Sequence, residues 1–154
     1  LEFFQKYQIG EFEVTPIKGE HPAHFEKNAA GYLIRQKDQT EFLYALDTGY
    51  YSEEVLQFLK GHKLDRFILE CTFGSAMRGD KPYSHLDLHS CIKLCDRLYE
   101  QGTLSDASEV YLTHINQEQE YTHEDFEELC RREREIKPYQ LYVAYDGLKL
   151  EEAQ

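Results

Sequence analysis

The chain has 154 residues, of which 41% are hydrophobic and 30% charged, a size and composition that suit one compact domain spanning residues 1–154. Its 17 basic and 29 acidic residues give a net charge of −12, which excludes sequence-wide nucleic-acid binding because phosphate backbones would repel it. No apolar run approaches the roughly 20 residues of a membrane span, and no basic and apolar leader opens the sequence, so we expect a cytoplasmic protein without a membrane partner.

The first third of the sequence is predicted to form strands. Phe12 and Val14 alternate with glutamates, which is the period of a half-buried strand. Two further apolar runs, 31–35 and 41–46, are separated by the polar residues 37–40, and this spacing predicts a hairpin.

Helices and strands alternate from residue 52 onward. Ser52, Asp87 and Thr122 are the predicted N-caps of three helices, and Thr122 stands three residues before Asp125, as in a capping box. Strands are predicted at 66–70, 109–113, 141–145 and 148–150. The order β-β-β-α-β-α-β-α-β-β predicts an α/β fold with a mixed or largely parallel sheet and helices packed against it.

The four cysteines show no metal-binding spacing. Cys71, Cys91, Cys95 and Cys130 contain no C-x-x-C pair, and Cys91 and Cys95 lie on the apolar face of a predicted helix. We therefore expect buried thiols rather than metal ligands.

Residues whose side chains could bind a metal ion or take part in catalysis follow several predicted strands. Asp47, Glu70 with Thr72, His114 and Asp146 each come directly after an apolar run. Ligands bind beyond the carboxyl ends of strands in such sheets, and a carboxylate beside an imidazole can hold Zn²⁺ or Mn²⁺. The alternatives are a turn role for Asp47 and Asp146 and a structural role for His114.

Five segments, in the same order, resemble motifs of the metallo-β-lactamase fold hydrolases. They are 15–21 with 31–34, Tyr44-Ala-Leu-Asp-Thr-Gly49, Ser84-His-Leu-Asp-Leu88, Val110-Tyr-Leu-Thr-His-Ile115 and Val143-Ala-Tyr-Asp-Gly147. The resemblance runs from about Val14 to Leu150 and is greatest to the phosphoribosyl cyclic phosphodiesterase (PhnP-like) group.

The resemblance implies a role for each matched residue. His21 would be a ligand of a first metal ion, Asp47 a carboxylate bridging two ions, and His114 a ligand of the second. His85 would lie over the substrate phosphate as a general acid or hydrogen-bond donor. His24 is an alternative to His21. Two ions, Zn or Mn, would lower the pKa of a bridging water and neutralise a small phosphorylated substrate, making the parent protein a metal-dependent phosphodiesterase.

The sequence departs from the family pattern in one respect. The His-x-His-x-Asp-His motif, which supplies half of the family's metal ligands, is absent. The sequence therefore resembles the C-terminal half of an αββα sandwich. Because His21, Asp47 and His114 would be divided between two ions, we expect the isolated chain to bind no ion, or one weakly, and to be inactive.

A half-sandwich would leave one sheet face uncovered. Such an apolar face predicts association, so we expect a homodimer in which a second copy replaces the missing half. The alternative to a hydrolase is a non-catalytic half-domain that self-associates or binds a partner. A third interpretation takes Asp47-Thr48-Gly49 as the motif of a dimeric aspartic protease, although the predicted helices argue against that nearly all-β architecture.

Overall fold

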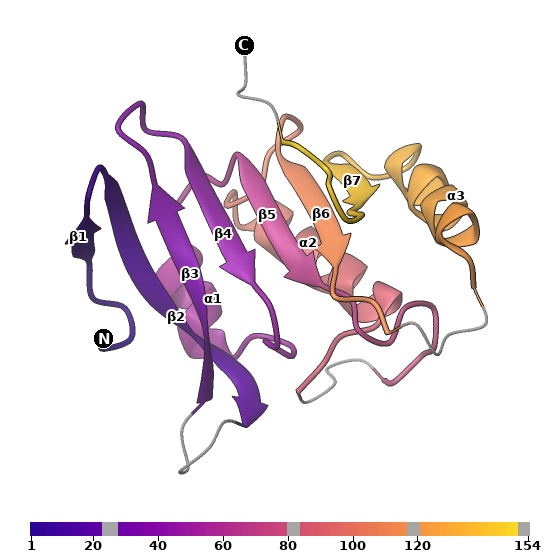
Figure 1. Ribbon diagram of the computed structural model, residues 1–154, viewed down its shortest axis with the longest axis horizontal. Coiled ribbons are helices and arrows are strands. Elements are labelled where there is room, and N and C mark those ends of the chain that lie inside the picture. The colour runs from indigo at the N-terminus through magenta and orange to yellow at the C-terminus, as the bar shows by residue number, and fades with distance from the viewer. Residues whose placement is uncertain (23–27, 80–83, 117–120, 151–154) are drawn as a thin grey trace.

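The computed structural model describes residues 1–22, 28–79, 84–116 and 121–150 (Figure 1). Within these residues the chain forms a seven-stranded sheet whose strands follow one another in sequence order. The strands are β1 (Tyr7–Ile9), β2 (Phe12–Pro22), β3 (Asn28–Arg35), β4 (Glu41–Ala45), β5 (Arg66–Glu70), β6 (Glu109–Thr113) and β7 (Gln140–Val143). The helices are α1 (Glu53–Leu59), α2 (Leu88–Glu100) and α3 (His123–Arg134).

The directions of the strands determine which of their ends lie along the same edge of the sheet. Strands β1 to β4 pair antiparallel, and β4 to β7 pair parallel. It follows that β2, β4, β5, β6 and β7 all run in the same direction, as the arrowheads in Figure 1 show for β2, β4, β5 and β6. Their carboxyl ends therefore lie along one edge of the sheet, which we call the carboxyl edge.

One face of the sheet packs against helices. Helices α1 and α2 lie behind the sheet in Figure 1, and α3 lies beside β7. Alternate residues of the strands, such as Leu43, Phe67 and Leu112, are fully buried and form one core with residues of α1 and α2. Burial of this continuous apolar surface is the main stabilising contribution to the fold.

The other face carries a row of large side chains. The strand registers place Tyr32, Tyr44, Ile68, Tyr111 and Tyr142 opposite one another across β3 to β7. All five are at least partly exposed, and the rings of Tyr111 and Tyr142 stack with centroids 5.3 Å apart. We call these five residues the tyrosine row. They give this face a continuous stripe of largely apolar side chains that is partly exposed to solvent.

The edge opposite the carboxyl edge is held by a buried carboxylate. Glu41, at the start of β4, is 4% exposed. Its oxygens contact His62 Nδ1 at 2.8 Å and accept hydrogen bonds from the Arg35 guanidinium at 3.0 Å and the Lys63 backbone amide at 3.2 Å. These contacts join β3, β4 and the loop after α1.

Most predicted elements are confirmed. The structure has the expected mixed sheet with helices against it, and Asp87 and Thr122 cap α2 and α3, the latter through a complete capping box. Ser52 lies at the N-cap of α1, but its side chain makes no cap hydrogen bond. All four cysteines are free and buried, as predicted. None of the helices in the described ranges is long and apolar enough to span a membrane.

Two strand predictions are wrong. Strand β1 was not expected, because its three residues include no apolar run. Residues 148–150, by contrast, form no strand. Asp146 and Gly147 form a turn closed by a hydrogen bond from Leu148 N to Tyr145 O, and the chain does not return to pair with β7.

Candidate functional site

The loop after β4 places Asp47 at the carboxyl edge. Asp47 has a φ of 47° and Gly49 one of 61°, so the chain turns sharply there. A Cβ atom on Gly49 would lie 2.9 Å from the backbone nitrogen of Ser84, which only glycine avoids. The Asp47 loop is thereby pressed against the segment that carries His85. A left-handed φ in a non-glycine residue is uncommon and is found often at functional sites.

Two histidines face the Asp47 carboxylate. His114 follows β6 with a φ of 57°, and its Nε2 lies 3.7 Å from Asp47 Oδ1. His85 Nδ1 lies 3.7 Å from the same oxygen. The two imidazole rings are stacked with centroids 6.0 Å apart. The expected neighbourhood of Asp47 and His114 is therefore present, with His85 at the same distance from Asp47 as His114.

His21 reaches the same place from β2. Its ring centroid is 4.7 Å from that of His85. Its Nδ1 lies 2.9 Å from the carbonyl oxygen of Pro22, which leaves Nε2 as the unprotonated nitrogen of the neutral ring. The alternative ligand His24 lies outside the described residues.

Glu70 forms the centre of the hydrogen-bond network beneath these side chains. Its carboxylate is fully buried at the end of β5. One oxygen accepts the backbone amides of Thr48 and Gly49 at 2.8 and 3.0 Å. The other accepts the Leu86 amide and lies 3.0 Å from His85 Nδ1. Glu70 therefore joins the Asp47 loop to the His85 segment.

The same network orients the two imidazoles. The Thr72 hydroxyl contacts both Glu70 Oε2 and His114 Nδ1, the latter at 2.9 Å. Because a carboxylate can only accept, Thr72 donates its proton to Glu70 and accepts one from His114 Nδ1. His85 Nδ1 donates to Glu70 in the same way. Both histidines are thus held with Nε2 free, as in metal sites where the other ring nitrogen contacts a protein acceptor.

The donor set suits a divalent metal ion. Ligand atoms of His21, Asp47 and His85 lie within 4.8 Å of one another, and so do those of Glu70, His85 and His114. Zn²⁺ and Mn²⁺ accept imidazole nitrogens and carboxylate oxygens as ligands, and Asp47 offers a partly exposed carboxylate. His85, which the resemblance makes a non-ligand, belongs to both groups.

Glu70 and Thr72 received no role from the sequence. Glu70 ends β5 and Thr72 follows it, and β5 lies between the strands that lead to Asp47 and His114, so their position was the available signal. Asp146 lies in a turn, in agreement with its simpler interpretation.

Comparisons with known proteins identify the fold. The family model described as "Beta-lactamase superfamily domain" matches residues 3–115. No curated protein sequence matches the chain.

Solved structures of this fold are similar over nearly the whole chain. Yeast PDE1 is 17% identical with a TM-score of 0.69, covering 96% of this chain and 48% of its own. The metallo-beta-lactamase fold protein YhfI from Bacillus subtilis is 18% identical with a TM-score of 0.67, covering 96% and 52%. Igni18, a metallo hydrolase from Ignicoccus hospitalis, is 13% identical with a TM-score of 0.64, covering 96% and 57%. The chain spans about half the length of these proteins.

These findings exclude the aspartic protease interpretation of Asp47. That architecture is nearly all β, whereas this chain packs helices on a mixed sheet and places Asp47 beside imidazoles. The family model matches most of the chain, and the sheet, the helices and the histidines around Asp47 agree with it: the protein belongs to the beta-lactamase superfamily and has the metallo-β-lactamase fold.

Proposed function

We propose that this chain is the C-terminal portion of a metal-dependent hydrolase of the phosphodiesterase type, related to the phosphoribosyl cyclic phosphodiesterase group. The observation that carries the proposal is the convergence of His21, Asp47, His85 and His114 at the carboxyl edge, with Asp47 Oδ1 3.7 Å from both His85 and His114. Histidines that surround one carboxylate suit the binding of a metal cation.

The residues that would hold metal are Asp47, His114 and His21. Zn²⁺ or Mn²⁺ bound there would lower the pKa of water and offset the charge of a phosphate, which a chain of net charge −12 would otherwise repel. Asp47 would bridge two ions, as the resemblance implies, and the proposal is supported by the 3.7 Å distance between its Oδ1 and His114 Nε2. His114 presents Nε2 to this space while Thr72 holds its Nδ1.

His85 has two possible roles in the proposed reaction. Its Nδ1 is held by the buried Glu70 carboxylate, so Nε2 is the ring nitrogen that would carry a proton for transfer. Such a group can donate a proton to a leaving oxygen, as the resemblance implies. The second possible role is metal binding, because His85 belongs to both groups of possible ligands.

We expect no nucleic-acid partner for this chain. The basic cluster on α3 is offset locally, since Arg131 and Arg132 both bind Glu128 at 2.8 to 2.9 Å and Arg131 also pairs with Glu135. The hydrogen bonds from Arg131 and Arg132 lower the pKa of Glu128 to about 2, so Glu128 is ionised at all ordinary pH values. We therefore propose a small phosphorylated substrate.

Calorimetric titration with Zn²⁺ and Mn²⁺ tests the site. We expect weak binding of at most one ion per chain, because the matched ligands serve two positions. Asp47→Asn should weaken binding at least about tenfold, by analogy with the loss of other supporting groups at metal sites. Equal affinity in wild type and Asp47→Asn would contradict the proposal.

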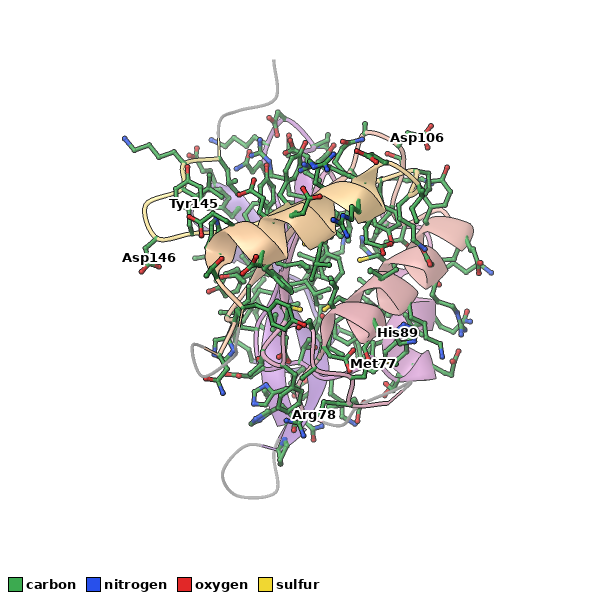
Figure 2. All side chains as sticks on the ribbon, turned by 90° about the vertical axis from the view of Figure 1, so that its right-hand side faces the viewer. Met77, Arg78, His89, Asp106, Tyr145 and Asp146 are labelled. Atoms are coloured by element: carbon green, nitrogen blue, oxygen red, sulfur yellow. The ribbon has the colours of Figure 1, made fainter. Side chains whose placement is uncertain are left out.

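An exposed histidine provides the matched control. His89 lies on the outer side of α2, as Figure 2 shows, and is exposed. His89→Gln should therefore leave metal binding unchanged, whereas His114→Gln should weaken it. Sequencing about a hundred codons upstream provides an independent check, since a His-x-His-x-Asp-His motif there would support the proposed phosphodiesterase.

The second candidate function is self-association through the open sheet face. The tyrosine row spans β3 to β7 and is partly exposed in every member, which is the observation that favours it. A row of partly exposed aromatic and aliphatic side chains on one face is typical of an interface. A second copy of the chain, bringing an identical row, would cover it.

A further inference from the structure

An arginine stacks on an aromatic ring beside the proposed metal site. The guanidinium carbon of Arg78 lies 4.6 Å from the centroid of the Phe73 ring. The same ring contacts the imidazole of His85, with centroids 5.8 Å apart and planes at 89°. Figure 2 shows Arg78 at the lower end of the molecule, the end to which β4, β5 and β6 point in Figure 1. Phe73 therefore contacts both Arg78 and a residue of the proposed site, at the carboxyl edge.

The backbone around Arg78 is anchored to the start of α2. The Arg78 amide donates to Asp87 Oδ2, and the Ser90 hydroxyl donates to the carbonyl oxygen of Gly79 at 3.1 Å. Asp87 and Ser90 are both buried. The second oxygen of Asp87 accepts the Ser90 amide at 2.7 Å, so backbone amides occupy both carboxylate oxygens. Asp87 thus holds the loop through its backbone and not through the charge of Arg78.

The Arg78 guanidinium retains its hydrogen-bond donors. It is exposed, and no carboxylate or carbonyl oxygen of the described residues accepts from it. Arg134 provides the contrast, because its guanidinium also stacks on a ring, that of Tyr142 at 4.7 Å, but donates to the Leu141 carbonyl oxygen at 3.0 Å. The remaining arginines all pair with carboxylates: they are Arg35, Arg66, Arg97, Arg131 and Arg132. Stacking occupies the face of a guanidinium and leaves the N–H groups in its plane available to an oxyanion.

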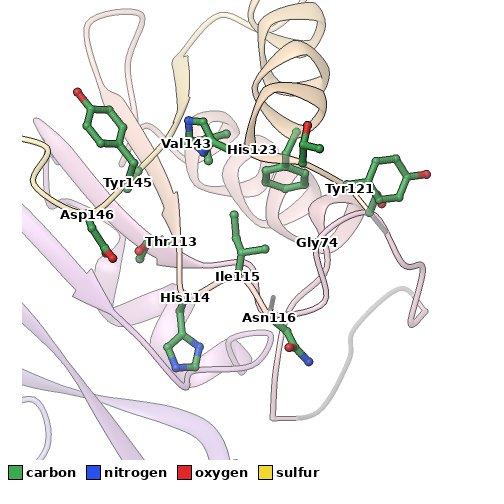
Figure 3. A pocket seen from close by; sticks show the side chains of 14 residues that line it. Gly74, Thr113, His114, Ile115, Asn116, Tyr121, His123, Val143, Tyr145 and Asp146 are labelled. Carbon is green, nitrogen blue, oxygen red and sulfur yellow. The ribbon is translucent and has the colours of Figure 1, made fainter. Parts of the chain in front are cut away.

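A cavity of about 580 Å³ adjoins the loop that begins at Phe73. Gly74 and His114 both line it, as Figure 3 shows. The described residues that line the cavity include Asp146 but no lysine or arginine. An anionic group inside the cavity would therefore meet the negative charge of Asp146 without a guanidinium or ammonium group to offset it. The loop after Phe73, rather than the cavity, supplies a permanent positive charge.

We infer that Arg78 is a substrate-binding residue that contacts the phosphate of the proposed substrate beside His85. The guanidinium presents two parallel N–H groups to two oxygens of one phosphate, and stacking on Phe73 orients it before the phosphate arrives. Its charge also attracts an anion toward a chain whose net charge is −12. The inference rests on the proposed hydrolase function for the identity of the substrate, but phosphate binding by Arg78 requires no metal ion.

Inorganic phosphate is the probe, and its binding is measured by calorimetry at low salt in the presence of EDTA. Arg78→Gln should weaken phosphate binding about 3- to 10-fold, because a charged hydrogen-bond donor is lost at a position open to solvent. Arg78→Lys keeps the charge without the paired N–H groups and should lose less. The matched control is Arg132→Gln, which removes an equally charged, exposed side chain that already pairs with Glu128, and it should leave phosphate affinity unchanged. Circular dichroism verifies that each variant is folded.

Three phosphate-binding results would overturn the inference: no binding by the wild type, equal affinity in wild type and Arg78→Gln, or an equal loss in Arg132→Gln. Titration of the same proteins with Zn²⁺, without EDTA or phosphate, distinguishes a binding role from a structural one. Arg78 belongs to neither group of possible metal ligands, so Arg78→Gln should bind Zn²⁺ as the wild type does. Weaker Zn²⁺ binding by Arg78→Gln would indicate a structural role and contradict the inference. Absence of Zn²⁺ binding by the wild type would instead contradict the proposed function.

Discussion

Glu70 shows how a single buried carboxylate can organise a site. Its fully buried oxygens accept hydrogen bonds from a backbone loop, a hydroxyl and an imidazole that come from separate segments of the chain. A buried charge is costly unless donors surround it, and here five donors do so. The residues at the surface of the site are thus oriented by one below it.

Replacing this carboxylate should affect both folding and metal binding. In Glu70→Gln one amide oxygen can still accept the Thr48 and Gly49 amides, but the amide nitrogen would oppose the donors Thr72 and His85. We expect the free energy of unfolding in urea to fall by about 1–3 kcal/mol. Metal affinity should fall about 10- to 100-fold. The control is Glu109→Gln, which removes the charge from a partly exposed ion pair with Arg66. Its effects on the free energy of unfolding and on metal affinity should both be much smaller.

The cysteines are predicted to be unreactive in the folded protein. Burial raises the pKa of Cys91 and Cys95, and raises that of Cys130 to about 12, from an ordinary value of 9.0. Because the folded state holds these protons more tightly, stability is unaffected below pH 9 and is lost as the pH rises toward 12. Titration with a thiol reagent at pH 8 should show no rapid reaction until urea is added, and fast labelling of native protein would contradict this prediction.

At the residue scale, the sequence indicated which residues would lie at the site, but it did not indicate the hydrogen bonds that hold them in place. Asp47 and His114 could be expected together because both follow strands, and the structure does place them 3.7 Å apart. The function of Glu70 could not be read, because it depends on donors from residues 48, 49, 72, 85 and 86 arriving at one point. No local pattern encodes such a convergence.

At the scale of elements, two loops are locked together by a close approach. Gly49 has a positive φ, and its α-carbon faces the backbone of Ser84, itself at a φ of 73°. Since the clash would be with backbone, neither loop can move aside cheaply. The connection fixes the distance between Asp47 and His85.

Gly49→Ala tests this connection. The added methyl group would meet Ser84 N at 2.9 Å and would force an unfavourable φ of 61° on alanine. We expect a loss of about 1–3 kcal/mol in the free energy of unfolding, measured by chemical denaturation. Gly10→Ala is the control, since its φ is also 61° but nothing lies within 4 Å of the added carbon. An equal loss in both variants would show that φ alone matters.

The elements that were predicted correctly have local signals. Strands β5 and β6 were expected at their observed bounds, and Asp87 and Thr122 mark the starts of α2 and α3. Strand β1 lacks such a signal, because it exists only through pairing with β2. Residues 148–150 have the composition of a strand but no partner to pair with. Pairing is a tertiary property, and this explains both errors.

At the scale of the whole molecule, an apolar face is combined with a large negative charge. The tyrosine row favours association of two copies, while two chains of net charge −12 repel each other. We therefore expect dimerisation to strengthen when the salt concentration rises from about 0.01 to about 0.15 M, as the screening length falls from about 30 to about 8 Å. Sedimentation equilibrium measures the dissociation constant at each concentration.

A charge placed within the row should abolish this association. Tyr44 is its most exposed member at 40%, so Tyr44→Glu places a carboxylate on the surface without disturbing the core. We expect a monomer at every salt concentration. Ile136→Glu, at an exposed position after α3, is the matched control and should dimerise as the wild type does. A folded wild-type monomer at micromolar concentration would contradict the predicted interface.

The shared direction of five strands has a consequence for how this protein can change. The Glu41 contacts lie at one end of the strands, while Asp47, His85 and His114 occupy connections at the other. Selectivity can be retuned by exchanging loop side chains, and randomised libraries that spare Gly49 and the residues bound to Glu70 should retain a high fraction of folded members.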